Sequence, residues 1–141
     1  MTKMLQALFA FEVHSSAPER NVIQTPTGAR DQVMHQSDAT GQPLLLDGKF
    51  GADIIRFPAG GQVDTHVHDG AHMLFCLAGA GVVEYGSPSD ADLESHSLYP
   101  GLCYLIPGQV PHAIRATTDL VLIAVGNDHR PVGSPARLDL V

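Results

Sequence analysis

The stretch of sequence that decides the fold is GGQVDTHVHDGAH, which spans residues 60–72. Its first two histidines, His66 and His68, are separated by one residue. Alternate side chains of a β-strand share a face, so we expect both rings to point the same way from backbone positions about 7 Å apart. Asp69-Gly70 is typical of a turn, and a reversal there would bring His72 beside His68 on a neighbouring strand. The stretch therefore predicts most of a metal site.

Composition narrows the classes of protein to consider. The chain has 141 residues, which suits one domain with a single core, and 44% of them are hydrophobic. The formal net charge is −7 and no cluster of Lys and Arg occurs. Nucleic-acid binding needs a basic surface, and anionic membranes repel an acidic one, so we expect neither as a partner.

Targeting and redox signals are weak. No apolar run is long enough to cross a bilayer, and the short apolar stretch near the N-terminus is followed by no signal-peptide cleavage site. We therefore expect a cytoplasmic protein. Cys76 and Cys103 lie in apolar, strand-like runs and are expected to be buried free thiols. A disulfide between them stays open if those strands are neighbours.

Short apolar segments separated by turn signals run along the chain without helical periodicity. This pattern predicts an all-β sandwich or barrel in a single domain. We expect a loop at residues 41–43 and a hairpin turn at Asp47-Gly48. Residues 1–50 would form an N-terminal strand and an extended arm on the barrel or a partner subunit, residues 51–126 the barrel, and residues 127–141 a tail of the same domain. The expected strands are residues 6–13, 33–34, 52–57, 72–78, 82–85, 93–98, 102–106, 112–116 and 120–125.

A fourth histidine completes a resemblance to a known family. His112 follows a stiff loop, residues 107–111, that would deliver it to the start of a strand. The chain resembles the cupins, small β-barrels of jelly-roll type. Their first motif is matched by Gly60, His66, His68, His72 in place of the usual Glu, and Gly79. Their second motif is matched by Gly101, Pro107 and His112, with Gln109 where Gly is usual and Ala116 where Asn is usual.

The resemblance implies one divalent metal ion at the base of a barrel cavity, held by His66, His68, His72 and His112. Imidazole suits Zn, Cu, Fe and Ni. We expect zinc, with iron, nickel or manganese as alternatives. Four neutral ligands cancel none of the ion's charge, so the ion would strongly lower the pKa of bound water and favour anionic oxygen donors. Two alternatives stay open, namely that His72 is not a ligand and that the histidines hold no ion.

For several other side chains the sequence allows two positions, in the cavity wall or elsewhere. Alternation from His72 and His112 places Leu74, Cys76 and Ile114 on the ligand-bearing face, either as a cavity wall or as ordinary core. Gln109 and five further polar residues would line the cavity or face solvent: Tyr85, Tyr104, Arg56, Arg115 and Glu84. The remaining histidines show no ligand spacing and are expected to be exposed: His14, His35, His96 and His129.

Among cupins with an all-histidine site, the chain looks most like the cyclases of aromatic polyketide biosynthesis, of resistomycin type. That resemblance implies aldol cyclisation of a poly-β-ketone, a small hydrophobic and oxygen-rich substrate, and a homodimer. The alternatives are a non-haem iron dioxygenase of the cupin type, a non-catalytic metal- or ligand-binding cupin and, ranked lower, a sugar isomerase.

Overall fold

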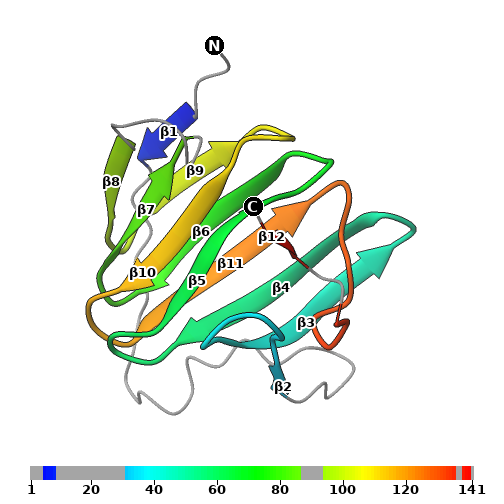
Figure 1. The fold of residues 1–141 in the computed structure, drawn as a ribbon, viewed down its shortest axis with the longest axis horizontal. Helices are drawn as coiled ribbons and strands as arrows, with labels where there is room; N and C mark the ends of the chain where they lie inside the picture. Colours follow the sequence, from blue (N-terminus) through cyan, green and yellow to red (C-terminus); the bar gives the residue numbers. More distant parts are fainter. Residues whose placement is uncertain (1–4, 9–30, 87–93, 136–137, 141) are drawn as a thin grey trace.

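Every regular element in the described residues is a β-strand. The computed structural model describes residues 5–8, 31–86, 94–135 and 138–140. Their strands form two antiparallel sheets that face each other as a jelly-roll sandwich (Figure 1). The all-β prediction is therefore confirmed. No helix of the length and hydrophobicity that a membrane crossing requires occurs in these four ranges.

The larger sheet has seven strands, in the order β1-β9-β6-β11-β4-β3-β2. Burial alternates along its central strand β11, so one of its faces covers the core. A ladder without a register shift joins β4 and β11 from the pair Phe57–Leu120 to the pair Gly51–Gly126. The strands are β1 (Leu5–Leu8), β2 (Gln32–Val33), β3 (Thr40–Asp47), β4 (Phe50–Phe57), β6 (His72–Ala78), β9 (Leu102–Ile106) and β11 (Leu120–Gly126).

The smaller sheet has five strands, in the order β12-β5-β10-β7-β8. The strands are β5 (Gln62–Val67), β7 (Gly81–Tyr85), β8 (Glu94–Leu98), β10 (His112–Ala116) and β12 (Asp139–Leu140). Side chains alternate between buried and partly exposed along β7, so one of its faces covers the core. The core lies between the sheets and contains Ile55, Leu74 and Leu122 from one, and Val63, Val83 and Ile114 from the other.

Asp69-Gly70 does not close a hairpin, and this prediction is wrong. β5 and β6 flank it but belong to opposite sheets, so the chain crosses the sandwich there. A side chain at the start of β6 therefore meets the end of β5 across the interior rather than along a ladder. The predicted turn at Asp47-Gly48 is confirmed, because Asp47 pairs with Phe50 and Gly48 has a φ of 58°.

The loop predicted at residues 41–43 lies inside β3. The register of β3 against β4 shifts between Pro43 and Leu45. A proline has no N–H to donate, so it is tolerated in a sheet at such an irregularity. The prediction of a loop here is therefore wrong, because the strand continues through these residues.

Both ends of the chain add a strand to the sandwich. β1 pairs with β9 at one edge (Figure 1), and β12 pairs with β5 so that Leu140 lies opposite His66. The rest of the predicted strand over residues 6–13, the arm and His14 lie outside the described residues. The tail therefore joins its own barrel beside the histidine cluster.

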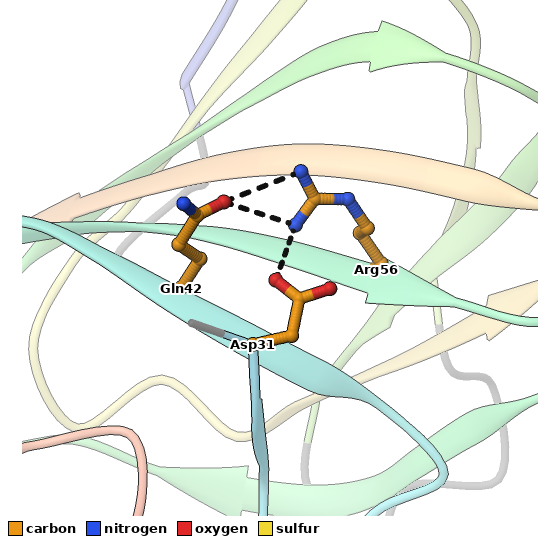
Figure 2. Close-up of polar contacts among 3 residues, drawn as sticks. All are labelled: Asp31, Gln42 and Arg56. Carbon is orange, nitrogen blue, oxygen red and sulfur yellow. Dashed lines mark hydrogen bonds and ion pairs between the residues drawn. The ribbon is translucent and has the colours of Figure 1, made fainter. Parts of the chain in front are cut away.

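Arg56 faces away from the sandwich interior. Its guanidinium donates to Asp31 Oδ1 at 2.8 Å and to Gln42 Oε1 at 3.4 and 3.5 Å (Figure 2). These contacts link the segment before β2 to β3 and β4. Arg115 likewise pairs with Glu84 at 3.2 Å on the outer face of the smaller sheet. The structure thus places both arginines and Glu84 on outer faces.

The two cysteines are free and buried. Their strands, β6 and β9, are neighbours, but Cys103 lies opposite Phe75. Successive side chains of a strand point to opposite faces, so Cys76 and Cys103 lie on different sides of the sheet. Neighbouring strands therefore do not bring the two thiols together.

Candidate metal centre

Four histidines converge at one end of the sandwich. His66 lies near the end of β5, His68 follows that strand, and His72 and His112 begin β6 and β10. The ring centroids of His66 and His112 are 4.3 Å apart, and these residues are paired in the β5–β10 ladder. The ring of His72 comes from the opposite sheet and lies 4.6 Å from that of His68 and 4.9 Å from that of His112. The structure therefore brings together all four histidines singled out from the sequence.

Three of the four form a tighter group. One ring nitrogen from each of His66, His68 and His112 lies within 4.8 Å of the others. Such spacing allows three ligands to surround one ion. His72 lies outside that spacing while its ring stays adjacent to two members of the group. Three histidines could thus hold a metal ion as placed, and His72 stands next to them.

Backbone carbonyls fix the protonation of two rings. Nδ1 of His66 lies 2.8 Å from the carbonyl oxygen of Asp64, and Nδ1 of His112 lies 2.8 Å from that of Val110. Because a carbonyl oxygen only accepts, Nδ1 carries the proton in both rings and Nε2 keeps its lone pair. This tautomer leaves Nε2 of each ring able to bind a metal ion.

Nε2 of His112 indicates whether the cluster suits a metal ion. It is buried and has no hydrogen-bond partner among the residues that the structure describes. Buried polar atoms are nearly always paired, so an orphaned ring nitrogen in a group of histidines fits a metal ligand. Burial lowers the pKa of His112 well below its usual value, and the neighbouring His66 lowers it further. His112 is therefore neutral at physiological pH, as a ligand must be.

Two loops hold the histidines in place. The loop before β10 packs on the turn after β5, where the N–H of Gln109 donates to the carbonyl of His68 at 2.8 Å and its side chain donates to Asp69 Oδ1 at 2.6 Å. A Cβ on Gly108 would lie 2.2 Å from the carbonyl oxygen of Asp69, so only glycine allows this approach. Gln109 has a φ of 64°, is exposed and does not line the cavity as suggested, because its side chain turns toward Asp69.

A cavity of about 60 Å³ opens beside the cluster. Leu74 and Ile114 line it, whereas Cys76, also suggested for the wall, does not. Cys76 lies deeper in the core, where burial raises the pKa of its thiol to about 11. Tyr104 is core as well, and its hydroxyl donates to the carbonyl of Ser97 at 2.8 Å. Other apolar residues of the lining come from both sheets and the tail: Met34, Ile55, Phe57, Val63, Ala124, Val125 and Leu138.

The prediction that His129 is exposed is wrong. Only 8% of its side chain is exposed, it lines the cavity, and its Nε2 lies 3.0 Å from Oδ2 of Asp53. The one signal in the sequence was Asp53 itself, a carboxylate in the otherwise apolar run at the start of β4, which needs a partner when buried. His35 is exposed, as expected, and His96 is partly buried against Tyr85, with ring centroids 5.4 Å apart.

Comparison with protein families gives one match. The model described as a cupin domain matches residues 53–126, just over half of the chain. That range contains all four clustered histidines, and it excludes β1 and β12. No curated protein matches the chain.

Solved structures of similar fold are distant in sequence. KdgF from Halomonas sp. superposes with a TM-score of 0.64 at 19% identity, over 74% of this chain and 93% of that one. Oxalate decarboxylase from Bacillus subtilis, studied for its Mn(II) centres, gives 0.64 at 15% identity, over 83% of this chain and 31% of that one. Salicylate 1,2-dioxygenase from Pseudaminobacter salicylatoxidans gives 0.57 at 18% identity, over 64% and 26%. These likenesses establish a shared fold.

Proposed function

This chain belongs to the cupin family, and from that premise we propose that it is a metal-dependent enzyme with one divalent ion held by His66, His68, His72 and His112. The observation that carries the proposal is the convergence of these rings, with ligand nitrogens of three of them within 4.8 Å of one another. The lone pair left on Nε2 of His66 and of His112 supports it. Surface histidines without a metal role have no reason to share this arrangement.

The ion would supply Lewis acidity, polarising a carbonyl oxygen of the substrate. A site of imidazoles alone leaves its 2+ charge uncancelled, which favours oxygen donors that gain negative charge during the reaction. We propose zinc, with iron, nickel or manganese as alternatives. Manganese is included among the alternatives because the structurally similar oxalate decarboxylase has Mn(II) centres.

The cavity suits a substrate with an apolar body and chelating oxygens. Its wall is mostly aliphatic, and Asp128, His129 and Arg130 contribute polar groups. The aliphatic wall would exclude water and orient a carbon chain, and Arg130 would bring positive charge toward carbonyl oxygens. A volume of about 60 Å³ admits the reacting end of a chain rather than all of it. We therefore propose aldol cyclisation of a poly-β-ketone, with the chain extending out of the cavity.

One observation favours a second candidate, a non-haem iron dioxygenase. His72 lies outside the 4.8 Å group, which leaves a three-histidine set without a carboxylate. A second support is that a salicylate 1,2-dioxygenase has a similar fold. A non-catalytic metal- or ligand-binding role is the remaining alternative. The homodimer expected from the resemblance stays a proposal, which light scattering on the purified chain tests.

The test is carbon-acid chemistry on a simple 1,3-dicarbonyl compound. The zinc-loaded protein, incubated with ethyl acetoacetate in D₂O, should speed deuterium uptake at the carbon between the two carbonyls. Chelator-treated protein should fall to the buffer rate, and readdition of zinc should restore the activity. Oxygen consumption by the iron-loaded protein, together with no metal-dependent exchange, would contradict the cyclase and favour the dioxygenase.

A further inference from the structure

The buried pair of His129 and Asp53 lies beside the histidine cluster but is separate from it. His129 lines the cavity, whereas Asp53 does not and lies behind it, with 1% of its side chain exposed. Nε2 of His129 and Oδ2 of Asp53 are 3.0 Å apart. The order is therefore cavity, imidazole, carboxylate. Neither residue belongs to the ligand set proposed above.

Three alternate positions of one hairpin hold the imidazole. The N–H of His129 donates to the carbonyl of Lys49 at 2.7 Å. The ring lies on Gly51, where a Cβ would come within 2.4 Å of Cδ2, so a larger residue would displace it. Nε2 of the ring lies 3.0 Å from Oδ2 of Asp53. The backbone of His129, one face of its ring and one ring nitrogen thus each contact the same hairpin.

The nearness of Asp53 favours one tautomer of His129. Nε2 lies at an ion-pair distance of 3.0 Å from Oδ2 of Asp53, and the contact is not a hydrogen bond by its geometry. Because a carboxylate accepts, this proximity favours the proton on Nε2 and the lone pair on Nδ1. Among the described residues Nδ1 makes no hydrogen bond. An imidazole that lines a cavity and has a buried carboxylate behind it is the arrangement of a general base.

We propose that His129 is the general base and acid of the proposed metal-dependent reaction, and that Asp53 is its positioning residue. This inference rests on the proposed function. Nδ1 takes a proton from the carbon between two carbonyl groups as the C–H bond breaks, and the electron pair moves onto a carbonyl oxygen. Asp53 balances the charge of the imidazolium. The carbanion adds to a second carbonyl carbon, and the new alkoxide takes the proton from Nδ1–H. In the dehydration step Nδ1 removes the second proton from the same carbon, the C=C bond forms as the C–O bond breaks, and Nδ1–H gives that proton to the departing hydroxyl, which leaves as water.

Deuterium exchange with ethyl acetoacetate tests the role in the full-length, zinc-loaded chain. His129→Ala should lower the rate about 100-fold or more with zinc content and KM little changed, because general acid–base catalysis contributes at least that much. Added imidazole should restore part of the rate in His129→Ala, which a merely structural role would not allow. His129→Gln repeats the test without the space that alanine leaves, and His35→Ala, at an exposed histidine, is the matched control and should keep the wild-type rate.

A second readout needs neither metal nor substrate. Long-range ¹H–¹⁵N spectra of the metal-free protein should show His129 as a single Nε2–H tautomer. Asp53→Leu, which fills the site but accepts no hydrogen bond, should abolish that preference, and Asp53→Asn, whose amide oxygen still accepts, should retain it.

The outcomes separate the two proposals. Wild-type exchange that persists in both His129 variants, or an Nδ1–H tautomer in the wild type, overturns this inference and leaves the proposed function standing. Absence of exchange by the zinc-loaded wild type overturns the proposed function, and the role of His129 falls with it.

Discussion

His66 and His112 face each other across the β5–β10 ladder with ring centroids 4.3 Å apart, and each donates Nδ1–H to the carbonyl two residues before it. The same local bond therefore occurs on two strands that are far apart in sequence. The bond keeps the proton on Nδ1 and so leaves the lone pair of each Nε2 available to a metal ion.

Removing either paired histidine should remove the metal. With His66→Ala or His112→Ala, zinc measured by mass spectrometry after dialysis should fall from one ion per chain to near zero, because each loss leaves too few fixed donors. His35→Ala should keep one ion, since that side chain is exposed. Full occupancy in both ligand variants would contradict the proposed site.

The metal-free protein should become less stable as the pH is lowered. The folded pKa of His112 lies well below the unfolded value of 6.5, mainly because of burial. Between those values the unfolded chain binds the extra proton, so the stabilisation is complete above 6.5 and is lost as pH falls through the folded pKa. Urea midpoints from pH 7.5 to 5 should show this decline, and a flat profile would contradict it. His112→Gln, which cannot titrate, should show a weaker dependence.

A methyl group at position 108 should disturb the site from a distance. In Gly108→Ala the added Cβ would meet the carbonyl oxygen of Asp69 at 2.2 Å and force apart the loops that carry His68 and His112. We expect a loss of about 2 kcal/mol in unfolding free energy, in the range of known backbone strain, and zinc affinity lowered at least about 10-fold. Calorimetric titration measures the affinity; an unchanged value would mean that the loop contact does not position the ligands.

The thiols should be inert in the folded protein. Burial raises the pKa of Cys76 to about 11 and also raises that of Cys103, so little thiolate forms near pH 8. Ellman's reagent should label neither cysteine quickly under native conditions and both in guanidinium chloride. Rapid labelling of one thiol in the native state would show that its strand opens.

The sequence was sufficient for the fold and for the identity of the clustered histidines. Local signals carried both: period-two alternation, Gly-containing turns and the spacing of His66, His68, His72 and His112. The sequence predicted a wrong connection between β5 and β6. Asp69-Gly70 is typical of a hairpin turn, but here it lies in a segment that crosses from one sheet to the other. Only the three-dimensional arrangement shows that His72 approaches from the opposite sheet.

His129 illustrates a different limit of sequence reasoning. It lies in the tail after β11, and nothing in the residues around it predicts burial. Its partner Asp53 was visible as a charge in an apolar strand, but the pairing joins residues 76 positions apart. Such a contact depends on the packing of the tail against the β3–β4 hairpin. Gln109 is a similar case, because its side chain donates to Asp69 and does not line the cavity.

Anomalous scattering from crystals of the zinc-loaded protein would show whether four imidazoles surround one cation. We expect a single peak at the zinc edge, about 2.0–2.1 Å from one ring nitrogen of each of His66, His68, His72 and His112. In crystals of His72→Ala the peak should remain with one protein ligand fewer. A peak elsewhere on the molecule, or no peak between these rings at saturating zinc, would contradict the account.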